Sequence, residues 1–109
     1  KWNVYLLLSN HKIIMKKFII KRAMTGVWGA PKHELDKAGK ASEAVLIEMR
    51  AEGKEIQQEQ SYVAGDAIYC IYNAASADLI REHAERSNGV ATEITEIATL
   101  IKHNTSVVS

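Results

Sequence analysis

The sequence predicts an α+β fold whose strands and helices follow the order β-α-β-β-α-β. Three observations support this order: β-rich segments stand near both ends of the chain, a hairpin pattern lies in the middle, and a helical pattern follows the first and third strands. The order is typical of the ferredoxin-like arrangement. In that arrangement four antiparallel strands form one sheet, the first and third strands are central, and both helices cover one face.

The first strand is expected over residues 16–24, where the apolar run "FII" is rich in β-formers. "TGVWGAP" then contains two glycines and a proline, so it predicts a loop. A long helix is expected over residues 32–52, because small and apolar side chains recur at helical spacing from Leu35 to Met49. Gly53 stands directly after it, where helices prefer glycine.

A hairpin is expected from two extended runs, residues 56–63 and 67–74, on either side of the tight turn Ala64-Gly65-Asp66. Ser76 is the expected N-cap of a helix that runs to about Ser87. A last strand is expected over residues 93–101, which are rich in β-branched side chains.

The chain of 109 residues is long enough for one hydrophobic core but not for two. It is 47% hydrophobic and 25% charged, the profile of a soluble globular domain. Fourteen basic and thirteen acidic side chains leave a net charge of +1, so no basic surface favours a nucleic-acid partner. A single cysteine excludes an intrachain disulfide, and we expect a cytoplasmic location because reducing conditions suit a free thiol.

The first fourteen residues, "KWNVYLLLSNHKII", are interpreted as a leader or upstream segment, because Met15 opens the first strand pattern. Their apolar run is much shorter than the ~20 residues of a membrane-spanning helix, and polar residues 10–12 interrupt it. We therefore expect no membrane partner. The domain is expected to cover residues 15–103, followed by a flexible tail over residues 104–109.

The strand over residues 67–74 is apolar on both faces, so it should be central and covered on both sides. Two helices can cover only one side of the sheet. A second copy of the chain, packed sheet to sheet, would cover the other side, and we therefore expect a homodimer. An additional strand from residues 1–14 is the alternative cover.

The hairpin and the second helix carry the most specific motif of the chain. It consists of Ser61-Tyr62-Val63, a Gly-Asp turn, Tyr69-Cys70-x-Tyr72, and then Ile80-x-x-His83-Ala84. This motif resembles a family of small bacterial ferredoxin-like domains that was long catalogued as of unknown function and is described as nickel-binding. The likeness covers most of residues 15–101. One departure is "NGVA" after the second helix, where Val90 replaces a Gly-Phe-Pro-like stretch.

The resemblance implies that the chain is a small metal-binding protein whose cofactor is nickel or a similar divalent transition metal. Cys70 and His83 are the candidate ligands, since a thiolate and an imidazole suit such metals. Tyr62 and Tyr72 are the candidate neighbours of the metal site or pocket, with phenols that can hydrogen-bond a ligand. A four-coordinate site needs further ligands, and a second copy of the chain is one source.

Two other interpretations of this motif stay open. Cys70 and His83 are ordinary core residues if they serve packing and hydrogen bonding alone. Alternatively, the chain is a small enzyme of the dimeric α+β barrel type, with His83 as the acid or base in a cleft between sheet and helices. The two side chains meet only if the even-numbered face of residues 67–74 points toward the helices, and the sequence pattern leaves that undecided.

Overall fold

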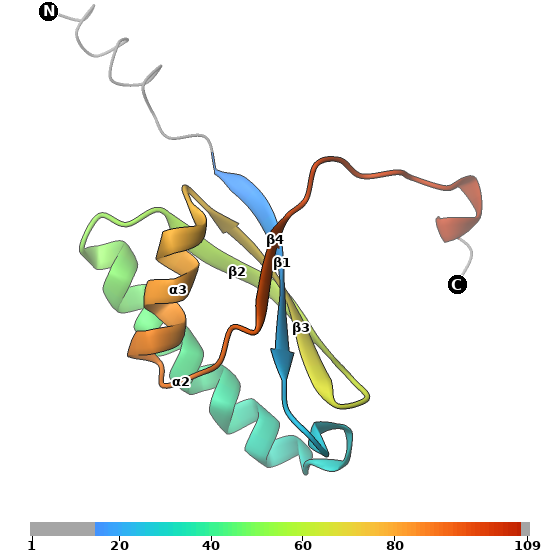
Figure 1. Ribbon diagram of the computed structural model, residues 1–109, viewed down its shortest axis with the longest axis horizontal. Coiled ribbons are helices and arrows are strands. Elements are labelled where there is room, and N and C mark those ends of the chain that lie inside the picture. The colour runs from blue at the N-terminus through green and yellow to red at the C-terminus, as the bar shows by residue number, and fades with distance from the viewer. Residues whose placement is uncertain (1–14, 108–109) are drawn as a thin grey trace, which may run out of the picture.

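The computed structural model describes residues 15–107, and the predictions for residues 1–14 and for residues 108–109 lie outside this range. Its elements follow one another in the predicted order (Figure 1). They are β1 (Lys16–Ala23), the 3-10 turn η1 (Val27–Gly29), α2 (Lys32–Ala51), β2 (Ile56–Ala64), β3 (Ala67–Ala74), α3 (Ala77–Arg86), β4 (Glu93–Glu96) and the 3-10 turn η2 (Asn104–Val107).

The four strands form one sheet in the order β2-β3-β1-β4, and every neighbouring pair is antiparallel. The predicted α+β fold is confirmed, and so is the central position of β1 and β3. Both helices lie on the same side of the sheet (Figure 1). Ile20 of β1, Tyr72 of β3, Leu46 of α2 and Ile80 of α3 belong to one buried core between the helices and the sheet.

The even-numbered side chains of β3 face the helices, which answers the question that the sequence left open. Cys70 is 1% exposed and Tyr72 is fully buried, whereas Tyr69 and Ile71 between them are only half-buried. The same alternation places Phe18 and Ile20 of β1 in the core. The opposite surface of the sheet, which we call the open face, is formed by residues that include Ile19, Lys21, Tyr62, Tyr69, Ile71 and Thr95.

The last strand is shorter than the sequence predicts, because β4 ends at Glu96 and not near Ile101. Its partner strand explains the difference. Glu96 lies opposite Phe18, and one further hydrogen bond joins the amide of Ile97 to the carbonyl of Lys17 at 2.8 Å. Because β1 begins at Lys16, the residues after Ile97 have no strand within residues 15–107 to pair with, whatever their β propensity.

The end of α3 has a Schellman motif that fixes the path of the next loop. Asn88 has a positive φ of 58°, the left-handed conformation that commonly ends helices. The amide of Gly89 donates to the carbonyl of Ala84 at 2.7 Å, and the amide of Asn88 donates to that of Glu85 at 3.2 Å. This turn directs the loop toward β1, where the carbonyl of Val90 accepts a hydrogen bond from Arg22.

Candidate functional site

A chain of hydrogen bonds runs through the core from β1 to α2 and includes the histidine that the sequence singled out. Arg22 donates from Nη2 to the hydroxyl of Tyr72 at 2.6 Å. That hydroxyl lies 3.1 Å from Nδ1 of His83. On the other side of the imidazole ring, Nε2 lies 3.1 Å from the carbonyl oxygen of Ser42 and 3.1 Å from its hydroxyl. Both nitrogens of His83 are therefore engaged within the protein.

The donor at one end of this chain, Arg22, and the acceptor at the other end, the carbonyl of Ser42, determine the tautomer of His83. A carbonyl can only accept, so Nε2 carries the proton and donates it to Ser42. Nδ1 then accepts from Tyr72, whose own oxygen accepts from Arg22. Burial, helped by the nearby Arg22 cation, lowers the pKa of His83 below its usual value. Burial also raises the pKa of Tyr72 to about 12, so the phenol remains a donor.

The chain of hydrogen bonds continues from Ser42 to the cysteine. The Ser42 hydroxyl donates to Oε1 of Gln58 at 3.2 Å, and Nε2 of Gln58 donates to the hydroxyl of Ser61 at 2.7 Å. Ser61 in turn donates to the sulfur of Cys70 at 3.2 Å. His83 and Cys70 thus belong to one polar network, although three other side chains lie between them.

This network forms part of the wall of a pocket of about 520 Å³ between the sheet and the first half of α2. The composition of α2 explains the space. In its second half Leu46 and Met49 fill the gap to the sheet and are buried. Its first half presents small residues to the same gap, so the helix and the sheet stay apart there; they are Ala38, Gly39, Ala41 and Ser42.

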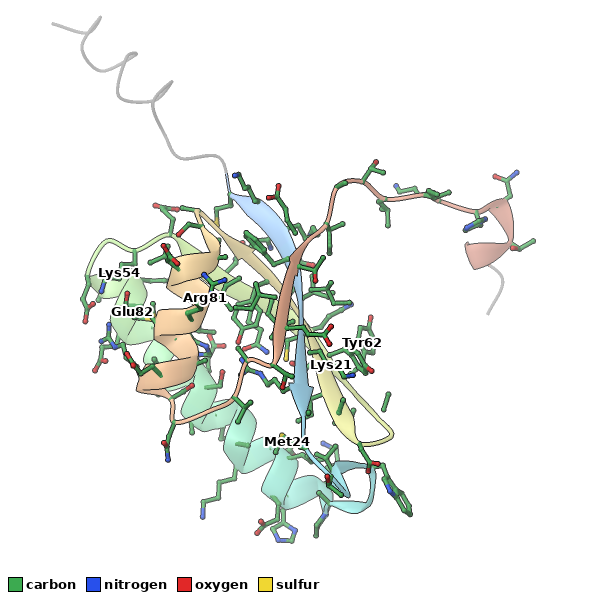
Figure 2. All side chains as sticks on the ribbon, in the orientation of Figure 1. Lys21, Met24, Lys54, Tyr62, Arg81 and Glu82 are labelled. Carbon is green, nitrogen blue, oxygen red and sulfur yellow. The ribbon has the colours of Figure 1, made fainter. Side chains whose placement is uncertain are left out.

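The structure brings three of the four predicted site residues to the helix side of the sheet. Cys70 lines the pocket, while His83 and Tyr72 lie in the core behind it. Because His83 is fully buried and both its ring nitrogens are hydrogen-bonded, it can contact a pocket ligand directly only by giving up its bond to Tyr72 or to Ser42. Tyr62 is 55% exposed and lies on the open face, opposite Tyr69, where its hydroxyl accepts a hydrogen bond from Gln60 (Figure 2). The structure therefore does not bring Tyr62 to the other three.

Residues that could hold a metal are sparse on this side of the sheet. The sulfur of Cys70 and the carboxylate of Asp36 line the same pocket, and Asp36 is paired with Lys32. Within residues 15–107, no three histidine, cysteine, aspartate or glutamate side chains gather closely enough to hold a metal ion by themselves. In the same part of the chain, no helix is long and apolar enough to cross a membrane.

Comparison with known proteins identifies the family. Residues 18–97 match the family described as "Nickel responsive protein SCO4226-like". The chain belongs to this family. The family resemblance that its motif indicates is therefore confirmed.

Among solved structures, the chain is similar to SCO4226 from Streptomyces coelicolor A3(2), known from a crystal structure, with a TM-score of 0.64 and 25% sequence identity. The likeness covers 78% of this chain and 99% of that one. No curated protein matches. The structural likeness thus extends over the whole domain of this family member.

Sequence reasoning missed Arg22, Ser42 and Gln58, which connect the network. For Arg22 a signal was present: it continues the even-numbered series of β1 after Phe18 and Ile20, both of which are buried. A charged residue at an inward position of a central strand is unusual and indicates a polar partner in the core. Ser42 and Gln58 carry no comparable signal, because their roles depend on how α2 lies on the sheet.

Proposed function

We propose that this protein binds nickel or a similar divalent transition metal and acts in the response to that metal. Membership of the nickel-responsive family over residues 18–97 is the observation that carries the proposal. The donor types support it, since a thiol and an imidazole lie on the same side of the sheet within one polar network.

Cys70 and His83 are the ligands that we propose for the metal. Cys70 presents its sulfur to the pocket, whereas His83 must exchange its hydrogen bond to Tyr72 or to Ser42 for the metal. The guanidinium of Arg22 lies beside Cys70 and repels cations, so metal uptake there requires the thiolate form of Cys70.

The test is calorimetric titration of the tag-free protein with NiCl₂ after treatment with EDTA and dialysis. We expect saturable uptake by the parent protein and a loss of affinity of about tenfold or more in Cys70→Ser and in His83→Gln. The charge-transfer absorption of a thiolate-nickel bond should appear in the parent and vanish in Cys70→Ser. His33→Gln is the matched control, because the His33 side chain is 80% exposed on the first turn of α2. We expect this variant to keep the nickel affinity of the parent protein.

The outcomes separate the function from the ligand assignment. A parent protein that takes up neither nickel, zinc nor copper would refute metal binding. If the parent binds nickel and both variants bind it equally well, the protein is a nickel-binding protein with other ligands. Loss of binding in His33→Gln would also contradict the assignment.

We further propose that the protein forms a homodimer through the open face of its sheet. Ile19 is 37% exposed and Tyr62 is 55% exposed there, beside the half-buried Tyr69 and Ile71. Apolar side chains that gather on one sheet surface favour a self-complementary contact. A copy packed on this face lies on the opposite side of the sheet from Cys70, so it adds no ligand at the pocket.

A further inference from the structure

We propose that the pocket between α2 and the sheet binds a small amphipathic carboxylate, whose head group contacts Arg22 and whose apolar part lies along α2. This proposal does not depend on nickel. It rests on the charge of Arg22 in the pocket lining, on the apolar side chains that line the same pocket, and on the size of the pocket.

The charge of Arg22 is not neutralised by a carboxylate of the described residues. Its guanidinium has five N–H donors. Two of its hydrogen bonds go to neutral oxygens, the carbonyl of Val90 at 2.5 Å and the hydroxyl of Tyr72 at 2.6 Å, and the sulfur of Cys70 is a further partner. A buried or half-buried cation is normally paired, because its desolvation is costly. An arginine that faces a pocket and has donors to spare therefore favours a carboxylate as its partner.

The other charged group at the pocket does not change this conclusion. Asp36 also lines it, but both carboxylate oxygens of Asp36 accept from Lys32, at 3.1 and 3.0 Å. Its side chain is 57% exposed, so solvent and Lys32 screen its charge. The other polar side chains that line the pocket can donate or accept a hydrogen bond and carry no carboxylate; they are Ser42, Gln58, Ser61, Cys70, Ser87 and Asn88.

The remaining lining is apolar and partly exposed. Met24 is 44% exposed, Val63 is 40% exposed and Val90 is 53% exposed, and all three line this pocket. Large apolar side chains left open to water around one cavity are typical of a binding site for an apolar group. The volume of about 520 Å³ lies in the usual range for small-molecule pockets and suits a chain of several carbons.

The test titrates the EDTA-treated parent protein with four probes. Binding of each probe is measured from the shifts of the backbone amide signals in NMR spectra. Octanoate carries both the head group and the chain. Octan-1-ol lacks the charge, octylammonium reverses it, and acetate lacks the chain. We expect saturable binding of octanoate, about tenfold or more tighter than that of the other three, with the largest shifts at amides of residues that line the pocket.

Two variants locate the contacts. Arg22→Gln should weaken the binding of octanoate about tenfold and leave the affinity for octan-1-ol unchanged. Arg50→Gln, at an exposed position of α2, is the matched control. Ala38→Phe fills the pocket from an exposed position of α2 and should weaken the binding of both octanoate and octan-1-ol. This variant keeps the test decisive if Arg22→Gln does not fold.

Three results would overturn the proposal. They are the absence of saturable octanoate binding to the parent, equal affinity for octanoate and octylammonium, and octanoate binding that Ala38→Phe leaves intact.

Discussion

At the scale of single residues, Tyr72 is the side chain on which the polar network depends. Its hydroxyl is the acceptor for the Arg22 guanidinium and the donor for Nδ1 of His83, and the residue is fully buried. Burial raises its pKa to about 12, which keeps the proton on the phenol at neutral pH. One oxygen atom thus satisfies a cation and an imidazole.

Tyr72→Phe removes that oxygen and is expected to lower the free energy of unfolding by ~1–3 kcal/mol, because the buried His83 and the half-buried Arg22 both lose their partner. Tyr62→Phe is the matched control. It removes a hydroxyl from an exposed side chain on the open face and should cost less than ~0.5 kcal/mol. Urea unfolding of both variants measures the difference, and equal costs would contradict the role of Tyr72.

The lowered pKa of His83 makes the stability of the protein depend on pH. In the unfolded chain His83 takes up a proton near pH ~6.5, whereas the folded protein holds it neutral to a lower pH. The unfolded state therefore binds more protons as the pH falls from 7 to 5, and the free energy of unfolding should fall by up to ~1.4 kcal/mol per pH unit.

Unfolding curves between pH 7 and pH 5 check this expectation. His83→Gln should show a flatter dependence than the parent, while His33→Gln, altered at an exposed histidine, should keep the slope of the parent. Parallel curves for the parent and His83→Gln would mean that another group titrates in this range.

Sequence could predict which site residues are present but not how they connect. Cys70, Tyr72 and His83 follow from a motif within one hairpin and the next helix, so local spacing carries that information. The links between them come from α2 and from the bulged strand β2, where the register shifts between Gln58 and Gln60. A bulge changes which side chains face inward, and the sequence pattern does not mark its position.

At the scale of elements, α2 is one continuous helix whose two halves pack differently against the sheet. Its helical period predicts the element within one residue at its end, but not that the first half leaves a pocket beside the sheet. That pocket arises from side-chain size, and the helical period alone does not show which small side chains of α2 lie beside a gap. The extent of β4 is a similar case, because it depends on where β1 begins.

The C-terminal end of α2 is joined to α3 by a group of charges around Arg86. Arg86 donates to Glu52 at 2.8 and 2.7 Å and to Glu82 at 2.9 Å, and it also contacts Glu48. The hydrogen bonds from Arg86 to Glu52, with one from Lys54, lower the pKa of Glu52 to about 2. Lys54 and Glu82 lie side by side at this end of the helix pair (Figure 2).

Arg86→Gln is expected to raise the pKa of Glu52 toward its ordinary value of 4.5, measured by NMR titration of the side-chain carboxyl. Because the folded pKa lies below the unfolded one, the contribution of this group to stability is present above pH 4.5 and is lost as the pH falls toward 2. Arg81→Gln is the control, since Arg81 pairs with Asp78 on the first turn of α3. An unchanged Glu52 pKa in Arg86→Gln would show that Lys54 alone keeps this pKa low.

At the scale of the whole molecule, the sheet separates two surfaces of different composition. The helix side holds the core, the polar network and the pocket, whereas the open face carries apolar side chains that no element of residues 15–107 covers. The sequence predicted this division from the two-sided apolar pattern of β3. It could not assign Cys70 to one side, because both sets of β3 side chains are apolar.

If the open face forms the dimer, a charge placed on it should produce monomers, because an unpaired charge is costly in an apolar interface. Ile19→Lys puts a charge on the open face, and Ile47→Lys puts the same charge at a 62% exposed isoleucine of α2 on the other side of the molecule. Light scattering after gel filtration should give a dimer for the parent and for Ile47→Lys, and a monomer for Ile19→Lys. A monomeric parent, or dissociation by Ile47→Lys alone, would place any self-association elsewhere. Because Cys70 lies on the opposite side of the sheet, the monomeric variant should still bind nickel at that residue, so dimer formation and metal uptake are separable.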